Sequence, residues 1–481
     1  MRSFMTTLLL ALCLAGLGVS PTQAQLTGSD TPVELLETSP FGMGARAMGM
    51  GQAFIAVGDD LSGIAYNPAT ISQIRRMEFN LGLTHDNTKH GLRRSGFFET
   101  ERSDTRIEQI AVAYPHPVYR GALVWGFGFH RMADLTQDIF SRGVVDPNTA
   151  TEEIEDVVQT GAVNAWTGAA AIELTENLSV GASLSYLSGS RDEDLVLARG
   201  IDDPDAGGCP GLAPDEYGLF YGCGDPSEES LYKSVVRREA TLDGFTGAVG
   251  VLAKFENGVR LGGKIDLPKW MRYQGTTRSS LENYLFTEES DASLFEDDIT
   301  LPLSVGAGAS WAKNGLTLAA DLTWTDWSQT DFEGDILVPS PSGREFAYRS
   351  VAKINLGAEY FFADFPVQVR GGFFTEPLPY KLIAADGVSS IDPGADNVLG
   401  TEDDISSFGR FYPEADIVSD RKFVTLGAGI FIHDRFIVDV AFVTGNWERR
   451  TEDGFDAPSG FPTIEEVTQN RLFLTSTLRF D

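Results

Sequence analysis

The sequence predicts an all-β protein: a 14-stranded antiparallel transmembrane β-barrel with a small N-terminal helical or irregular plug in its lumen. Apolar and polar residues alternate with few interruptions from Met77 onward, which is the period of a β-strand. The connections between these strands alternate between short and long, and a segment rich in glycine and alanine, Ser39–Ile71, precedes the first strand. We therefore expect three parts, which are a signal peptide (1–24), a plug (25–75) and a barrel (76–481).

The first residues have the pattern of a secretory signal peptide. Arg2 supplies a positive charge, Met5–Gly18 is an apolar run, and Thr22-Gln23-Ala24 offers small residues before a cleavage site after Ala24. The apolar run is too short to span a bilayer as a helix, and no later segment reaches about 18 uninterrupted apolar residues. We expect an exported protein without a transmembrane helix.

The plug is expected to contain one or two short helices. Ala45, Met48 and Ala53 recur at helical spacing, and the glycines between them limit the length of any helix. Phe54–Val57 is expected to be a short extended piece. Asn67-Pro68-Ala69 is expected to form the turn from which the chain leaves for the first strand.

Alternation of period two defines the strands of the barrel. In Leu316–Trp324, the leucines and the tryptophan share one face, whereas Thr317 and Asp321 lie on the other. An even number of strands is typical of bacterial barrels. The predicted strands lie at about 77–85, 105–114, 121–133, 160–174, 178–192, 235–255, 259–274, 295–313, 316–331, 344–362, 366–381, 421–433, 435–447 and 470–480.

The lengths of the connections favour a membrane barrel over a soluble β-sandwich. Short turns join one end of the strands, and two of them contain Asn-Gly, a dipeptide typical of tight hairpins. Outer-membrane barrels have short periplasmic turns and long external loops, whereas a sandwich has no reason to place every long loop on one side. The long loops are expected at about 86–104, 134–159, 193–234, 275–294, 332–343, 382–420 and 448–469.

The distribution of charge agrees with this orientation of the strands. The formal net charge of −32 argues against nucleic acid as a partner, because phosphate binding needs clustered lysine and arginine. The charged members of the regular strands fall on the lumen face, where they are expected to contact the plug or a ligand; they include Arg260, Lys264, Asp321, Arg370 and Asp439. The aromatic residues Trp166, Tyr186, Trp324 and Tyr360 fall on the outward face.

Two loop features suggest covalent or metal stabilisation. Cys209 and Cys223 are expected to form a local disulfide in an oxidising compartment, with free thiols or a metal site as alternatives. Asp392, Asp396, Asp403 and Asp404 place oxygen ligands around tight turns and could hold structural Ca²⁺, the alternative being a solvated acidic loop.

The sequence contains no catalytic constellation. It has no G-x-S-x-G, H-E-x-x-H or P-loop motif, and its histidines are scattered. We expect no enzymatic activity and no cofactor apart from the possible calcium ion.

The order of residues in the plug resembles a known family. Gly44-Ala-Arg46-Ala47, Gly51-x-Ala53, Asp59-Asp60 and Asn67-Pro68-Ala69-x-Ile71 resemble the N-terminal hatch of FadL/TodX-type outer-membrane transport proteins; PorV/PorQ-type barrels carry a similar segment. The motif resemblance covers about 35 residues, and the rest of the chain matches in architecture only.

The resemblance implies a passive outer-membrane transporter of hydrophobic compounds such as long-chain fatty acids or hydrocarbons. Gly44, Arg46, Asp59, Asp60 and the Asn67-Pro68-Ala69 turn would then form the hatch. In this family a kink in the third strand opens the wall sideways, and the glycines of the predicted third strand, Gly121, Gly126 and Gly128, could mark such a kink. The alternative implied by the PorV-type barrels is a platform that binds proteins of a secretion apparatus.

Two features depart from the family pattern. The final residue is Asp481, so the aromatic residue that usually closes the last strand is the penultimate Phe480. The loops are also more acidic than the capture of a fatty-acid carboxylate would require, because like charges repel. These departures concern the ligand more than the fold.

Overall fold

The structure is a computed structural model in which the described residues are 42–93, 97–146, 151–201, 214–220, 232–283, 287–334, 346–382, 391–392, 405–406, 415–433, 435–451 and 463–480. None of the helices in these residues has the length and apolar character needed to cross a membrane.

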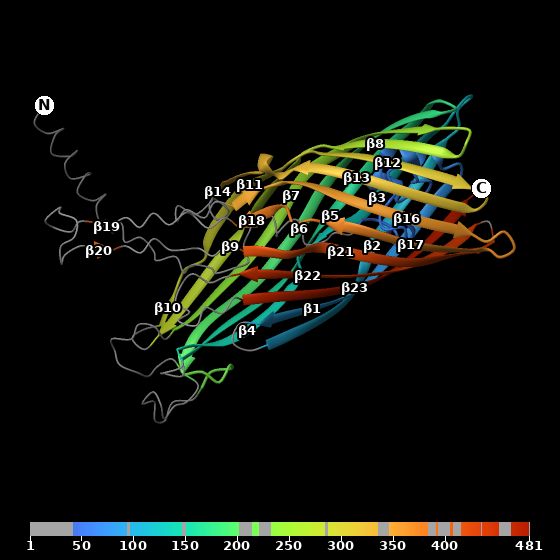
Figure 1. Ribbon diagram of the computed structural model, residues 1–481. Helices are drawn as coiled ribbons and strands as arrows, with labels where there is room; N and C mark the ends of the chain where they lie inside the picture. Colours follow the sequence, from blue (N-terminus) through green and yellow to red (C-terminus); the bar gives the residue numbers. More distant parts are fainter. Residues whose placement is uncertain are drawn as a thin grey trace, which may run out of the picture.

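The described strands form a closed antiparallel barrel of 14 strands, as the sequence predicts (Figure 1). The first strand pairs with the second and also with the last, from Met77↔Phe480 to Arg93↔Ile464, and this pairing closes the wall. Ten strands are uninterrupted: β1 (Met77–Arg93), β2 (Phe97–His116), β5 (Thr151–Thr175), β6 (Leu178–Ile201), β7 (Tyr232–Lys254), β16 (Ser350–Phe361), β17 (Val367–Glu376), β21 (Ala415–Ile432), β22 (Phe436–Thr451) and β23 (Thr463–Phe480).

Four further barrel strands are interrupted along their length. Pro268 and Pro302 lie at two of the interruptions, where a residue without a backbone N–H cannot continue the hydrogen-bond ladder. The interrupted strands are β3 (Leu123–Asp134) with β4 (Gln137–Asp146), β8 (Val259–Asp266) with β9 (Lys269–Asn283), β10 (Thr287–Glu289) and β11 (Ser293–Leu301) with β12 (Ser304–Lys313), and β13 (Leu316–Asp326) with β14 (Asp331–Gly334). Outside the barrel sheet are the pairs β15 (Phe346–Tyr348) with β18 (Tyr380–Leu382) and β19 (Ile391–Asp392) with β20 (Ile405–Ser406), and the short helix η2 (Trp327–Gln329).

The short turns lie where the sequence places them. Asn314 and Gly315 both have positive φ, 52° and 83°, as a two-residue type I′ hairpin requires. The glycine conformation also brings the chain within reach of Phe361 on the next strand, because a Cβ on Gly315 would lie 2.6 Å from its carbonyl oxygen. These turns and the end of β23 share one end of the barrel (Figure 1).

Several strands extend further toward the opposite end than the sequence predicts. The segment 86–104, expected to be a loop, is a hairpin in which β1 and β2 stay paired as far as Arg93↔Phe97. The segment 134–159 likewise contains β4 and the start of β5. Apolar alternation stops in these regions, but cross-strand ion pairs such as Lys89–Glu101 at 3.1 Å support the pairing in its place.

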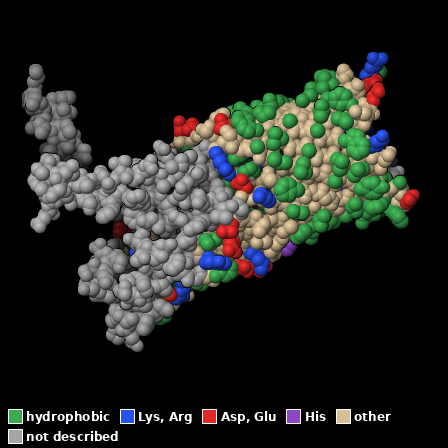
Figure 2. All heavy atoms as spheres, viewed as in Figure 1, with side chains coloured by type: hydrophobic (Ala, Val, Ile, Leu, Met, Phe, Trp, Pro, Cys, Tyr) green, Lys and Arg blue, Asp and Glu red, His purple; other side chains and the backbone are tan. Residues whose placement is uncertain are grey.

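The outer surface carries the apolar face of the strands, as predicted. Trp166, Tyr186, Phe245 and Trp270 occupy neighbouring register positions on β5, β6, β7 and β9, and each is more than 40% exposed. Trp324 and Tyr360 are exposed in the same way. In Figure 2 the apolar side chains spread over the barrel wall, and charged side chains gather toward its two ends.

The N-terminal segment Gly42–Arg76, here called the plug, lies inside the barrel (Figure 1). It contains α3 (Ala45–Gly49), α4 (Gly63–Tyr66) and the 3₁₀ helix η1 (Pro68–Gln73). The extended piece expected at Phe54–Val57 is instead a turn, closed by the hydrogen bond from Val57 N to Phe54 O at 3.3 Å. Glycines and turns separate α3 from α4, so each of these helices remains short.

Candidate functional site

Arg46 of α3 lies at the centre of an ion-pair network that joins the plug to the wall. Its guanidinium group contacts Asp59 at 2.5 Å and Asp60 at 3.2 Å within the plug. It also donates two hydrogen bonds to Glu359 of β16, at 2.9 and 2.8 Å, in a bidentate arrangement. One side chain therefore holds the acidic pair of the plug against the barrel.

The network continues into the wall through Arg370 of β17. Its Nε donates to Glu359 at 2.7 Å and its Nη1 donates to Asp439 of β22 at 2.6 Å. Arg370 was expected to contact the plug or a ligand. Its guanidinium group is linked to Arg46 through Glu359, and its aliphatic stem faces Gly49 of the plug, where a Cβ would lie 3.4 Å from Arg370 Cδ. The resulting chain of charges joins α3 to three strands of the wall, β16, β17 and β22.

The burial of this network affects the ionisation of its plug residues. Burial alone would lower the pKa of Arg46, but the carboxylates of Asp59, Glu359 and Asp60 hold the pKa well above its ordinary value. Burial raises the pKa of Asp60, and Arg46 offsets part of that rise. Arg46 therefore stays charged, and its removal would leave carboxylates in a site with little access to water.

The Asn67-Pro68-Ala69 segment anchors the plug to a second part of the wall. The Asn67 side chain accepts a hydrogen bond from Ala69 N at 3.1 Å, which caps η1, and Pro68 occupies the first position of that helix. The side-chain amide of Asn67 also donates to Ile55 O at 2.8 Å and to Val251 O of β7 at 3.1 Å. The chain therefore continues through η1 before it enters β1, rather than leaving the plug at this turn.

A ring of glycines in the wall gives the plug its fit. A Cβ at Gly250 would lie 1.9 Å from Asn67 Oδ1, and a Cβ at Gly372 would lie 2.2 Å from Gly51 N. Gly181 and Gly357 meet plug backbone at 2.5 and 2.3 Å in the same way. These wall positions exclude any larger residue while the plug is in place.

Two other lumen residues predicted to contact the plug do so, Asp321 through the plug backbone and Arg260 through both backbone and side chain. Asp321 of β13 accepts a hydrogen bond from Ile55 N at 2.8 Å. Arg260 of β8 lies 3.5 Å from Val57 O and 3.9 Å from Asp59. Lys264 differs, because its ammonium group pairs with Asp266 on its own strand at 2.8 Å.

The glycines considered as marks of a kink in the third strand have other positions. A Cβ at Gly126 would lie 2.8 Å from Ile64 of the plug, and one at Gly128 would lie 3.8 Å from Met43. Gly121 is in the turn before β3, with φ of 72°. The interruption of the third strand falls instead at 135–136, between β3 and β4.

Gly44 immediately precedes α3. Its φ of 92° lies in the region that favours glycine, and a Cβ there would lie 2.1 Å from Ser62 Oγ.

The predicted disulfide and most of the predicted calcium ligands cannot be placed, because Cys209, Cys223, Asp396, Asp403 and Asp404 lie outside the described residues. Asp392 ends β19, and the structure describes its backbone only.

The lumen beyond the plug has an apolar wall. The cluster includes Trp327 of η2 (3% exposed), Tyr273 of β9 (1%) and Leu135 between β3 and β4 (0%). A second group stacks Phe374 on Phe423 with ring centroids 4.7 Å apart, against Met48 of the plug. The other members of the first cluster are Ala133, Val163, Ala165, Leu187, Ala240, Leu242, Met271, Phe295, Ile299, Leu301, Val351 and Leu378.

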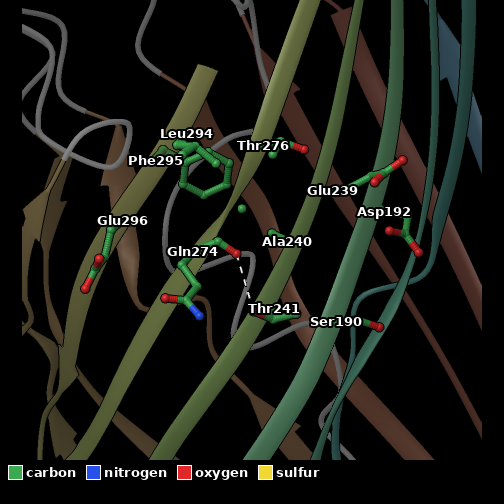
Figure 3. Close-up of a pocket in the computed structure, with 11 residues that line it drawn as sticks. Ser190, Asp192, Glu239, Ala240, Thr241, Gln274, Thr276, Leu294, Phe295 and Glu296 are labelled. Carbon is green, nitrogen blue, oxygen red and sulfur yellow. Dashed lines mark hydrogen bonds between the residues drawn. The ribbon is translucent and has the colours of Figure 1, made fainter. Parts of the chain in front are cut away.

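A groove of about 780 Å³ lies on the other side of the wall (Figure 3). Asp192, Glu239 and Gln274 line it, and they share the outward register of β6, β7 and β9 with the exposed aromatic residues described above. The groove is therefore on the outer surface of the barrel and does not belong to the lumen.

Comparison with solved structures identifies the architecture. The toluene transporter TodX of Pseudomonas putida matches with a TM-score of 0.58 and 15% identity, over 91% of this chain and 99% of that chain. A Pseudomonas aeruginosa FadL homologue matches with a TM-score of 0.57 and 15% identity (92% and 99%). The toluene transporter TbuX of Ralstonia pickettii matches with 0.54 and 16% (92% and 99%).

The chain has the FadL/TodX fold. The likeness noted in the plug thus extends to the architecture of nearly the whole chain, a 14-stranded barrel with an N-terminal plug. No protein-family model and no curated protein matches the sequence. At these identities the comparison establishes the fold, and the residues of the site must carry the function.

Proposed function

We propose that this protein is a passive, non-enzymatic outer-membrane channel for hydrophobic compounds, in which the plug acts as a hatch. The observation that carries the proposal is the position of a tightly seated plug directly beside an apolar lumen. The seat is formed by the glycine ring and the Arg46 network, and the apolar surface contains Trp327, Tyr273 and the stacked Phe374 and Phe423.

The apolar lumen favours a hydrophobic solute over ions or sugars. Ligand sites for apolar molecules are lined mainly by hydrophobic and aromatic side chains with a few polar groups. The relatives of the same fold include proteins described as toluene transporters and a monoaromatic hydrocarbon channel. We propose hydrocarbons or long-chain fatty acids as the solute class, with the acidic loops favouring uncharged solutes.

The hatch role rests on the contrast between two kinds of contact. Arg46, Asp59, Asp60 and Asn67 hold the plug by individual hydrogen bonds and ion pairs, and the chain joins the plug to the barrel at one end, where Arg76 precedes β1. Such contacts can be exchanged when the plug shifts, whereas neighbouring strands such as β5 and β6 are joined by long ladders of backbone hydrogen bonds. A movement of the plug away from Glu359 and Val251 would open the lumen toward the end with the short turns.

The third strand supplies a candidate exit through the wall. The β2–β3 ladder ends at Gln109↔His130, and β4 pairs with β5 beyond that point. Across the gap between β2 and β4, Thr100 Oγ1 donates to Asp138 O at 2.7 Å. We propose that this less completely paired part of the wall is where a hydrophobic solute leaves the lumen sideways.

Uptake by cells tests the proposed function. Cells that lack their own hydrocarbon channel and express this protein should take up radiolabelled toluene or oleate faster than cells with the empty vector. A variant with an aspartate at Leu242, a buried residue of the apolar lumen cluster, should lose the gain, because a buried charge opposes an apolar solute. Equal uptake by vector and protein, together with ion conductance through a continuous water-filled pore, would exclude the proposal.

A further inference from the structure

The lumen face of β1 is polar beside the plug. Its buried inward residues from Glu78 to Asp86 are Glu78, Asn80, Gly82, Thr84 and Asp86, of which only the glycine lacks a polar side chain. The plug approaches this wall at α3, where Ala45 N donates to Thr475 Oγ1 of β23 at 3.0 Å, and Thr475 is the register partner of Gly82. The ion-pair network described above uses none of these residues.

A β-bulge adds a further polar side chain to the same place. The register of β1 and β2 shifts between Gly82 and Leu83, and as a result the consecutive residues Glu108 and Gln109 are both buried. Gln109 lies over Gly82, because a Cβ on that glycine would be 2.6 Å from Gln109 Cγ. Bulges redirect side chains and are frequent next to functional sites.

The amide group of Gln109 has no hydrogen-bond partner within the described part of the chain, at either its oxygen or its nitrogen, although its exposed fraction is 0%. Three neighbours also carry buried atoms without a partner in that part: Asn80 Oδ1, Thr84 Oγ1 and His130 Nδ1. His130 is the register partner of Gln109 on β3. Buried polar groups nearly always find a partner, so a group of four such residues indicates a missing one.

We propose that Asn80, Thr84, Gln109 and His130, here called the polar strip, bind the uncharged hydrogen-bonding head group of an amphiphilic solute. Its hydrocarbon tail would lie along the apolar lumen wall. The inference rests on the proposed function and narrows its solute class to molecules such as alcohols, phenols, amides and protonated carboxylic acids. The side-chain amide of Gln109 offers a donor and an acceptor side by side. Each of these head groups can accept a hydrogen bond from that donor or donate one to that acceptor.

The charges around the polar strip favour an uncharged head group. Glu78 is already paired with Arg479 at 2.7 Å, and Asp86 is paired with Arg471. Both carboxylates flank the strip on β1, and because each is matched by an arginine, neither ion pair offers an opposite charge to an ionic head group. The strip is closed in this position of the plug, since a Cβ on Gly44 would lie 3.7 Å from Gln109 Oε1. A head group would reach it as the plug shifts, which couples solute binding to opening.

Binding of two probes of equal chain length tests the proposal. The full-length protein in nanodiscs should bind 1-decanol about tenfold more tightly than decane, the effect of one or two net hydrogen bonds. Gln109→Met keeps the shape of the side chain but removes both of its hydrogen-bonding atoms. In this variant the ratio of the affinity for 1-decanol to that for decane should fall to about one. Thr84→Val should reduce the ratio about threefold. Gln274→Met, in the groove on the outer surface, is the matched control and should leave it unchanged.

The outcomes separate this proposal from the proposed function. A wild-type protein that binds both probes equally, or a Gln109→Met variant that keeps the tenfold preference, overturns the polar strip alone. A wild-type protein that binds neither probe removes the proposed function as well. Retained heat-dependent mobility on gels confirms that each variant is folded, and the Thr84→Val result decides the matter if Gln109→Met does not fold.

Discussion

Replacing Arg46 with alanine should release the plug from the wall. Two hydrogen bonds to Glu359 would be lost, and the carboxylates of Asp59 and Asp60 would lose their common partner. Glu359 is 4% exposed, and removing one partner from a buried ion pair costs about 3–5 kcal/mol. The contact with Asp59 adds little, because its side chain is 34% exposed and solvent screens it.

The expected loss lies at the lower end of that range. Glu359 keeps its hydrogen bond to Arg370 in the variant, so its charge is not left without a partner. A loss of about 3 kcal/mol in the free energy of plug docking corresponds to an increase of about 100-fold in the population of displaced plug.

Thiol labelling measures that population. A cysteine in place of Ala47, which is fully buried in α3, would react with an aqueous maleimide only when the plug is displaced. In a background with Cys209 and Cys223 changed to serine, Arg46→Ala should label about 100-fold faster than the parent protein. Arg75→Ala is the matched control, because this plug arginine is 55% exposed and pairs with Glu173 at the surface. Similar labelling rates for the two arginine variants would refute the role of the Arg46 network.

Three further predictions use the same reasoning. Gly372→Ala would place a methyl group 2.2 Å from the plug backbone and should weaken docking by about 1–3 kcal/mol in the labelling assay, whereas Gly371→Ala, with its nearest atom at 3.9 Å, should not. Asn67→Ala should cost about 2–3 kcal/mol in that assay, through a lost helix cap and two lost hydrogen bonds; labelling at the parental rate would contradict this. Leu426→Arg, on the lipid face, should lower the free energy of unfolding in vesicles by about 2–4 kcal/mol. Leu294→Arg, in the groove on the outer surface, should change it by less than about 0.5 kcal/mol because Leu294 is 82% exposed among polar side chains, and equal costs at both positions would contradict the placement of Leu426 on the lipid face.

The barrel could be predicted from the sequence because its signals are local. Alternation identifies each membrane-facing strand, and Asn314-Gly315 fixes a turn through backbone conformation alone. The extension of β1 and β2 beyond residue 86 could not be predicted in this way, since both faces of that hairpin are polar. Its pairing depends on cross-strand contacts such as Lys89–Glu101, which local hydrophobicity does not report.

The sequence points to residues on both sides of the site, but not to how they pair. Arg46, Asp59 and Asp60 belong to the segment that resembles a hatch, but the resemblance does not predict that Arg46 pairs with both aspartates. Glu359 is 313 residues from Arg46, and only the closed register of the barrel brings it to the plug. The alternation of the strands places glycines such as Gly250 on the lumen face. That these glycines contact the plug could be seen only once the position of the plug was known.

The polar strip illustrates a different limit. Asn80 and Thr84 follow the strand period and could be assigned to the lumen face from sequence. Gln109 could not, because the bulge at Gly82 changes the register of β2, and a one-residue shift exchanges the two faces of a strand.

Mass spectrometry of molecules extracted from the purified protein tests the central claim most directly. A barrel that carries hydrophobic solutes past a hatch should retain about one apolar or amphiphilic molecule per chain when purified in a detergent of distinct mass. Changing Leu242 to aspartate in the lumen cluster should remove that molecule while the barrel remains folded. A purified protein that contains no such molecule, and conducts ions through a water-filled lumen with the plug in place, would contradict the account.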